Sequence, residues 1–393
     1  MPALSNYSPE EAIAVKLTCK QQDLARGLST VSHAVSTRTT LPILSHILVA
    51  AEGDSIRLSA TNLEIGITCR VPASIQQEGT TTVPARLFTD FVNSLPAAGV
   101  ELTLQPDTQN MLVKGQRSQA TIRGMDPSDF PSIPTAEGGE QPISIDAAEL
   151  KDMIAQTTFA AATDDARPVF TGVLARVRDG HLTFASADSF RLAVRAANLP
   201  GSEAASGDVL IPARTLSELA KVLPAEGSIQ MVVTPNRNQV LFHADGVDLV
   251  SNLIAGQFPN FEAIVPKDAA TRATLNTADF RQAAKTASLF ARDSSNIVRL
   301  KVEPGENGGI TPGSVVLQAT AEDVGDAVTT LEAAVDGKGL EIIFNVKYLT
   351  DVLAVLDTPE VALELNSPQQ PGVVKPIGAG DYTYVIMPMH NTR

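Results

Sequence analysis

The sequence has no tryptophan, few aromatic residues and only two cysteines in 393 residues. With 4% aromatic side chains against 44% hydrophobic residues, the core must be packed mainly by aliphatic groups. Cys19 and Cys69 cannot form a disulfide framework, and both stand in apolar, strand-like segments. We therefore expect two reduced core thiols, as in a protein of a reducing compartment.

Long apolar runs are also missing. No segment approaches the roughly 18 apolar residues of a membrane span, and the N-terminus lacks the basic-then-apolar order of a signal peptide. These absences predict a cytoplasmic protein with no membrane partner. Residues 1–12 are rich in proline, serine and glutamate, and we interpret them as a flexible N-terminal tail.

Positive charge is in deficit, because 30 Lys and Arg face 44 Asp and Glu, for a net charge of −14. This balance argues against a protein coated with cations, the usual form of a dedicated nucleic-acid binder. A basic surface confined to one face remains compatible with it.

One sequence pattern occurs three times, at Val83–Phe91 (VPARLFTDF), Ile211–Leu219 (IPARTLSEL) and Phe344–Val352 (FNVKYLTDV). The spacing is far longer than the roughly 20–50 residues of solenoid repeats. Two further sets of similar segments recur once per repeat at about the same spacing. The first set is Leu17–Cys19, Ile143–Ile145 and Ala273–Leu275, and the second is Ala60–Asn62, Ser186–Asp188 and Thr320–Glu322. The chain is therefore predicted to be a triplicated domain, with repeats at 13–137, 138–267 and 268–393.

Within a repeat, alternating apolar runs flank turn-forming clusters and predict β-hairpins. Leu102–Leu104 with Met111–Val113 is one such pair, and Ile229–Val233 with Val240–Phe242 is another. Thr215–Leu223 places its leucines on one stripe, as in a helix that covers a sheet. Each repeat is accordingly predicted to be α+β, an antiparallel sheet with a few helices.

Residues for catalysis are hard to find. The five histidines show no metal-ligand spacing, and Gly308-Gly309 lies in a loop rather than between a strand and a helix. The neighbouring carboxylates Asp164 and Asp165 are equally typical of a solvated loop. The pattern favours a binding or structural protein that uses no metal or cofactor. Two readings of this pattern stay open. The chain could be a monomeric scaffold that binds proteins but no DNA, or an α+β enzyme with a site between repeats.

Several segments together resemble the bacterial DNA polymerase III beta subunit, the beta sliding clamp. They are Thr40–Leu44, Val83–Arg86, Phe258-Pro259, Phe344–Val346 and the ending Tyr384–Met389 (YVIMPM), and the resemblance runs in order from about Ile13 to Met389. It implies a head-to-tail homodimer of three DNA-clamp domains per chain, with antiparallel sheets outside and helices lining a ring. Such a ring encircles duplex DNA without sequence preference and catalyses nothing.

The resemblance also implies working residues. The expected DNA-binding set combines loop arginines with cations on the predicted helices: Arg38, Arg86, Arg167, Arg214, Lys221, Lys20, Arg281 and Lys285. A hydrophobic peptide cleft for the polymerase alpha subunit, the clamp loader delta subunit and other clamp-binding-motif proteins is expected from Phe170, Leu192, Pro259, Ile264, Val385, Met387, Pro388 and Met389. Leu289 and Phe290 are expected at the dimer interface, opposite a small residue near Ala120.

The chain departs from the commoner family pattern at Ala187, Ser189, Phe190, Ala263 and His390. We expect these positions to alter the shape and the peptide preference of the cleft. A valine, Val169, follows Arg167 where the family has an aromatic residue that contacts DNA.

Overall fold

A computed structural model describes residues 15–36, 40–105, 108–134, 142–164, 166–201, 206–292, 295–305, 312–321, 325–378 and 380–389. The expected tail and Arg38 lie outside the described residues. The chain forms two compact units, Met1–Pro142 with Val222–Asn252, and Ile143–Lys221 with Leu253–Arg393. Each unit is described separately below.

The first unit contains one antiparallel sheet with the order β8-β7-β6-β1-β4-β16-β15-β14, and β3, β2 and β5 continue from β4. Its strands are β1 (Val15–Lys20), β2 (His46–Glu52), β3 (Ser55–Thr61), β4 (Ile65–Gln77), β5 (Gly79–Pro84), β6 (Gly99–Gln105), β7 (Asn110–Lys114), β8 (Gln119–Arg123), β14 (Ser228–Val233), β15 (Gln239–Ala244) and β16 (Val247–Asn252).

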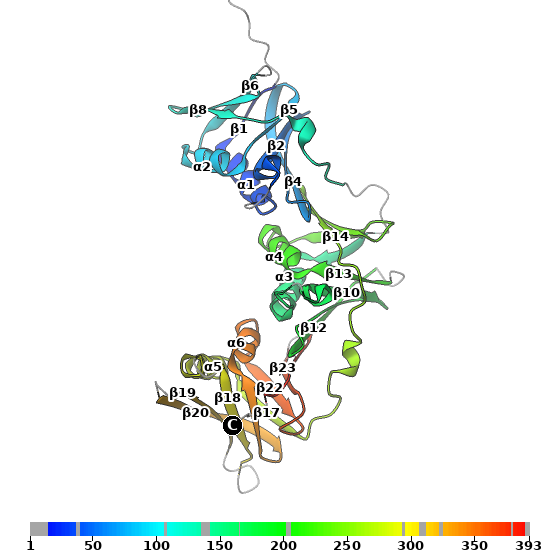
Figure 1. Cartoon of the computed structure of the whole chain (residues 1–393), viewed down its shortest axis with the longest axis vertical. Helices are drawn as coiled ribbons and strands as arrows, with labels where there is room; N and C mark the ends of the chain where they lie inside the picture. Colours follow the sequence, from blue (N-terminus) through cyan, green and yellow to red (C-terminus); the bar gives the residue numbers. More distant parts are fainter. Residues whose placement is uncertain are drawn as a thin grey trace, which may run out of the picture. The chain divides into compact units, whose positions relative to one another are not determined.

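Two helices, α1 (Gln21–Ser32) and α2 (Ala85–Ser94), pack side by side against this sheet (Figure 1). The buried Gln21 amide joins them by donating to the Val92 carbonyl at 2.9 Å. Helix α1 approaches β4 closely at Gly27, where a Cβ atom would lie 2.5 Å from a methyl group of Val71. A glycine is therefore required at this helix–sheet contact.

The second unit holds a twelve-stranded antiparallel sheet with the order β13-β10-β11-β12-β24-β23-β22-β17-β20-β19-β18-β21. Its strands are β10 (Gly172–Arg178), β11 (His181–Ala187), β12 (Arg191–Asn198), β13 (Gly207–Pro212), β17 (Thr271–Asn276), β18 (Ile297–Glu303), β19 (Gly313–Ala321), β20 (Gly325–Gly337), β21 (Leu340–Asn345), β22 (Glu360–Leu365), β23 (Gly372–Pro376) and β24 (Asp381–Ile386). The short β9 (Ile143–Asp146) leads into the first helix of this unit.

The remaining helices are α3 (Ala147–Thr157), α4 (Ala213–Val222), α5 (Thr277–Ala291) and α6 (Val346–Ala354). Helix α3 packs on β11 and β12, whereas α5 and α6 pack together and α5 covers β17 to β20 (Figure 1). Side-chain caps stabilise three helix starts, because Asp146, Asn276 and Asn345 each accept a backbone N–H of the first turn.

The predicted hairpins and helices are present. The hairpin β6–β7 contains Leu102–Leu104 and Met111–Val113, and α4 contains most of the predicted Thr215–Leu223. The helices α2, α4 and α6 begin earlier than the apolar stripe alone indicated, directly after Pro84, Pro212 and Asn345. The repeated sequence pattern is thus the end of a strand followed at once by the first turn of a helix.

The strand pairing also joins one repeat to the next within each unit. Strand β4 pairs with β16, with Ile67 opposite Leu249. In the second unit β12 pairs with β24, with Leu192 opposite Val385. Each of these pairings satisfies the backbone groups of a strand edge that would otherwise be open to solvent.

The two thiols are free and buried, as predicted. Burial raises the pKa of Cys19 and of Cys69 to about 12, above the value of about 8.5 of a thiol in an unfolded chain. Because the unfolded chain loses these protons first, stability is expected to fall as pH rises through the unfolded pKa.

Titration with a thiol reagent in mildly alkaline buffer should label neither cysteine in the folded protein and both in concentrated guanidinium. Rapid labelling of folded protein would contradict this burial.

Candidate functional site

An apolar surface lies at the β12–β24 joint of the second unit. Leu192 pairs with Val385 across the strands, and beyond the last ladder pair the Met387 N–H donates to the Phe190 carbonyl at 2.8 Å. Alternation along a strand places Phe190 with Leu192 and Met387 with Val385 on one face. Leu192 and Val385 are almost fully buried, whereas Phe190 is 59% exposed and Met387 38% exposed.

The turn before β12 is tightly fixed. The Asp188 carboxylate accepts the backbone N–H groups of Phe190 and Arg191 at 3.0 and 3.2 Å. Ser189 has a φ of +91°, a conformation in which a residue with a side chain is strained. The turn and the bond to Met387 therefore both hold the backbone of Phe190.

A buried cluster forms the floor of this surface and includes Leu174, Ala185, Ala187, Leu192, Leu210, Phe261, Val373 and Val385. Phe170 and Phe258 pack on it, with their ring centroids 6.1 Å apart in an edge-on arrangement. Pro259 and Ile264 are exposed and belong to the segment whose Phe258, Phe261 and Val265 pack in this cluster. We call Phe190, Pro259, Ile264 and Met387, with this floor, the junction surface.

The structure therefore brings the residues predicted for the peptide cleft into one region. Phe170, Pro388 and Met389 are partly buried, and the Met389 N–H donates to the Ile343 carbonyl at 2.8 Å. Leu192 and Val385 belong to the floor rather than to the exposed rim. Phe190 was not in the predicted lining, but it was among the positions expected to alter the shape of the cleft.

Arg191 binds elements of the second and third repeats together beneath the junction surface. Its guanidinium is 2.9 Å from the Asp188 carboxylate and 2.6 Å from the Asp351 carboxylate of α6. It also lies over the Tyr348 ring at 4.7 Å and the Phe159 ring at 5.6 Å. Burial raises the pKa of the nearby Tyr384, so its hydroxyl stays neutral and donates to the Tyr348 carbonyl.

Arg167, predicted to contact DNA, contacts this region. Its guanidinium lies 4.8 Å above the Phe170 ring and donates to the Ser189 hydroxyl at 2.5 Å. Both partners border the junction surface, and Arg167 itself is exposed. Its DNA contact stays a prediction.

The predicted helix cations differ in their availability. Arg86 and Lys221 are exposed but lie near acids of their own helices, Asp90 at 3.8 Å and Glu218 at 3.0 Å. Arg281 donates to the Leu353 and Leu356 carbonyls at the end of α6. Lys20, Arg214 and Lys285 are exposed, and within the described part of the chain no carboxylate lies within the ion-pair distance of 4.0 Å.

The two residues predicted for the dimer interface, Leu289 and Phe290, are neighbours on helix α5 but differ in burial. Its buried stripe consists of alanines and Phe280, and Phe290 packs partly against the same core. Leu289 points away from that stripe and is 62% exposed. Leu289 is thus an apolar side chain that its own domain does not cover.

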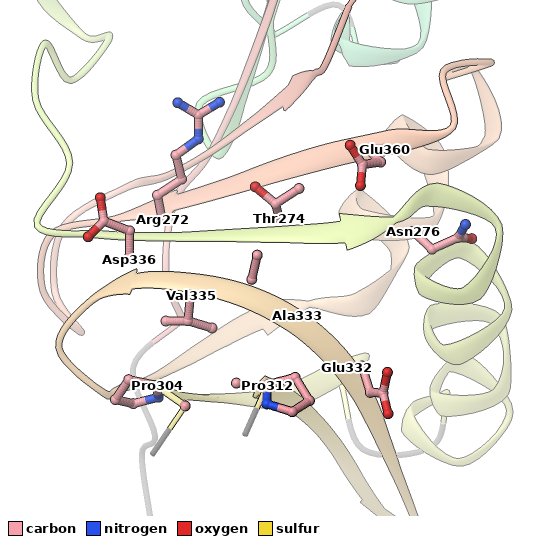
Figure 2. A pocket seen from close by; sticks show the side chains of 13 residues that line it. Arg272, Thr274, Asn276, Pro304, Pro312, Glu332, Ala333, Val335, Asp336 and Glu360 are labelled. Atoms are coloured by element: carbon pink, nitrogen blue, oxygen red, sulfur yellow. The ribbon is translucent and has the colours of Figure 1, made fainter. Parts of the chain in front are cut away.

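A hollow of about 680 Å³ lies on the sheet of the third repeat, away from these residues. Figure 2 shows Arg272 and Asp336 toward one end, Asn276 and Glu360 toward the other, and Thr274 between them. Arg272 faces Asp336 on β20, and Asn276 faces Glu360 on β22.

No group of three potential ligands able to hold a metal ion occurs among the described residues. No helix in the described segments is long and apolar enough to cross a membrane.

These features define the class of protein: helix-backed antiparallel repeats, joined strand to strand, with an apolar surface at one joint. Comparisons with known proteins agree. The sequence profiles of the DNA polymerase III beta subunit match in order: the N-terminal domain over residues 15–134, the central domain over 144–260 and the C-terminal domain over 262–390.

Full-length relatives give the same result. The beta sliding clamp of Synechocystis sp. is 33% identical over 395 residues, covering 95% of this chain and 99% of that protein. The crystal structure of the Bacillus subtilis sliding clamp superposes with a TM-score of 0.90 at 31% identity, over 96% of this chain and 100% of that one. The Pseudomonas aeruginosa clamp bound to griselimycin gives a TM-score of 0.87 at 28% identity, over 96% and 100%.

The chain belongs to the DNA polymerase III beta subunit family, the beta sliding clamps. It is a non-catalytic processivity factor of DNA polymerase III with the three-domain α+β clamp fold. Membership of this family implies DNA and polymerase as partners. The enzyme alternative is therefore wrong, and the family resemblance found in the sequence is confirmed.

Replacing Arg191 with methionine should destabilise the second unit. The change leaves Asp188 and Asp351 close together and largely buried without their shared cation, a loss of about 3–5 kcal/mol. Urea unfolding measures it. The matched control is Arg26→Met, because Arg26 is 79% exposed and 3.8 Å from Asp23, and its loss should cost less than about 1 kcal/mol. If both variants lose the same free energy of unfolding, Arg191 does not stabilise the second unit in the way described.

Proposed function

We propose that two copies of this chain associate head to tail into a closed ring around double-stranded DNA. The ring tethers the replicative polymerase through the junction surface and holds DNA by topology. The observation that carries the proposal is the way one repeat continues into the next by strand pairing. In the described part of the chain, β8 and the first part of β20 lack the neighbour that their equivalents in the other repeats have.

These edges belong to the first and the third repeat. Among the described strands, β8 has a ladder partner on one side only, which is β7. Strand β20 pairs with β19 over Gly325–Ala333 and with β17 only over Ala334–Gly337. The Gly325–Ala333 part therefore keeps one free edge in the described part of the sheet. Unpaired edges of this kind invite a further strand.

The repeats themselves specify how a second copy fits. Thr18 of the first repeat corresponds to Thr274 of the third, and these residues pair with Ser74 and Ala334. Ser74 of β4 is therefore equivalent to Ala334 of β20. Counting back the same number of residues along each strand makes Ile67 equivalent to Ala327. The hairpins β7–β8 and β15–β16 likewise make Ala120 equivalent to Leu249. Since Ile67 pairs with Leu249, we infer that Ala120 of one copy pairs with Ala327 of the other. The uncovered Leu289 supports a contact at the same joint.

DNA inside such a ring needs only contacts to phosphates, which carry no sequence information. The net charge of −14 fits a ring whose cations are concentrated on one face. Lys20, Arg214 and Lys285 are the most available of the helix cations, with Arg86 and Lys221 beside them. We expect Arg38 to add a loop contact, although it lies outside the described residues.

Short linear peptides are the ligands that fit the junction surface. Methionine adapts to varied side chains, and Met387 is partly exposed beside the ring of Phe190. The partners we infer are the polymerase alpha subunit, the clamp loader delta subunit and other proteins with a clamp-binding motif. All of this would take place in the cytoplasm.

Retention on DNA tests the ring. After loading by a cognate clamp loader, the protein should stay on nicked circular DNA and slide off the same DNA after linearisation, because only an end releases a closed ring. Gel filtration of the labelled complex measures the retained fraction. Equal loss from both substrates, or a persistent monomer at micromolar concentration, would favour the monomeric scaffold instead.

Two single variants should separate the two activities. Arg38→Glu is expected to weaken loading severalfold while leaving peptide affinity intact, because it reverses one phosphate-facing charge. Met387→Ala is expected to weaken peptide affinity, since it removes apolar area only from the junction surface, and to leave the protein's direct binding to duplex DNA unchanged. Loading assays, direct DNA binding at low salt and peptide anisotropy measure these effects. If Arg38→Glu loses peptide affinity, or Met387→Ala loses direct DNA binding, while remaining folded, the assignment of separate sites is wrong.

A further inference from the structure

Two joints between repeats share one design but differ in what covers them. At the first joint the Asn62 side chain accepts the N–H groups of Glu64 and Ile65, and the Asn252 N–H donates to the Glu64 carbonyl at 3.0 Å. Asp188 and Met387 make the same bonds at the second joint. The two turns and the strands after them are therefore equivalent position by position.

At the first joint the connecting segment closes over the apolar face. Ile133 packs on Val232, Leu241 and Val250. It fits because the position opposite Val250 is Gly66, where a Cβ atom would lie 2.9 Å from Ile133. The space left beside Gly66 and Val250 is about 80 Å³, and a larger hollow of about 480 Å³ borders the same segment toward Arg57 and Asp248. The chain's own segment thus covers the apolar face beside Gly66.

At the second joint the equivalent of Gly66 is Leu192, opposite Val385. The connecting segment, Phe258–Val265, follows another route, and its Phe261 is 5% exposed and belongs to the floor cluster. Arg176 of β10 holds it there. The guanidinium lies 5.2 Å from the Phe261 ring centroid and 3.0 Å from the Glu262 carboxylate, and it donates to Asp208 at 2.9 Å.

We propose that Arg176 is a positioning residue for peptide binding: it fixes the connecting segment so that Pro259 and Ile264 stand at the rim of the junction surface. This inference rests on the proposed peptide-binding function of that surface. Arg176 does not itself need to touch the peptide. It acts through Phe261 and Glu262, which lie between Pro259 and Ile264 in the sequence.

The other repeats show that the sheet alone does not require this arginine. The equivalent position in the first repeat is Ala50, opposite Thr80. In the third repeat it is Lys301, opposite Glu341, with its ammonium 2.6 Å from Glu303. An arginine with two acidic partners and an aromatic ring beneath it occurs where the connecting segment borders the junction surface.

The test compares Arg176→Ala and Arg176→Lys with Lys301→Ala, which removes a paired cation from the equivalent strand position of the third repeat. The probe is a fluorescein-labelled peptide that copies the clamp-binding segment of the cognate polymerase alpha subunit, followed by anisotropy with the full-length protein. Arg176→Ala should weaken binding about tenfold, because the rim must then be ordered on binding. Arg176→Lys should recover most of the affinity, and Lys301→Ala should leave it within about twofold.

A spectroscopic signal separates positioning from loss of stability. Because the chain has no tryptophan, Ile264→Trp introduces a single tryptophan, which can be excited selectively over tyrosine, at a position that is 44% exposed. Adding Arg176→Ala to this variant should shift the emission of the folded protein, whereas adding Lys301→Ala should not. Thermal melts should show similar unfolding temperatures for both doubly substituted proteins.

The outcomes distinguish the two proposals. If the unaltered protein does not bind the peptide, the proposed function fails. If it binds and Arg176→Ala binds equally well with unshifted emission, the positioning role is overturned, as it is if Arg176→Lys is as weak as the alanine variant. Should Arg176→Ala not fold, Glu262→Gln removes only the segment's end of the ion pair. It should weaken binding about threefold, and unchanged affinity there would equally overturn the role.

Discussion

The pairing of one repeat's strand edge with a strand of the next is the constraint on which the rest depends. A single repeat leaves backbone donors and acceptors exposed along an edge, and these groups must find partners. Strand β16 pairs with the edge of β4 in the first unit, and β24 pairs with the edge of β12 in the second. Repetition of one joint makes the chain continuous, and in the described part of the chain it leaves β8 and the first part of β20 without the neighbour that their equivalents have.

The same joint explains where a binding surface can form. Each joint begins with a turn held by an Asn or Asp side chain and ends with a backbone bond, so the side chains beside it are fixed. Gly66 leaves room for Ile133 of the connecting segment at the first joint, whereas the equivalent position at the second joint holds Leu192. Phe190, Ile264 and Met387 are exposed at the second joint. The two joints thus share their backbone pairing and differ in what covers them.

Much of this could be predicted from the sequence, because triplication repeats every local signal. The pattern at Val83, Ile211 and Phe344 indicates a strand end followed by a helix, and apolar alternation identified the hairpins. Contacts between distant segments could not be predicted this way. Arg281 meets the end of α6, and Arg191 meets Asp351, through strand order and helix packing that no local pattern records. The position of Phe190 beside Met387 follows only from the register of β12 with β24.

Disulfide trapping between copies tests the central claim most directly. Cysteines placed at Ala120 and Ala327 in one chain should join two copies covalently under mild oxidation, because directly opposed residues of antiparallel strands lie within disulfide reach. The native Cys19 and Cys69 are buried and should not compete. We expect a covalent dimer that withstands denaturant from the double variant, and none when Val328 replaces Ala327 as the cysteine position. The absence of a dimer in the first case, or equal yields from both, would contradict the account.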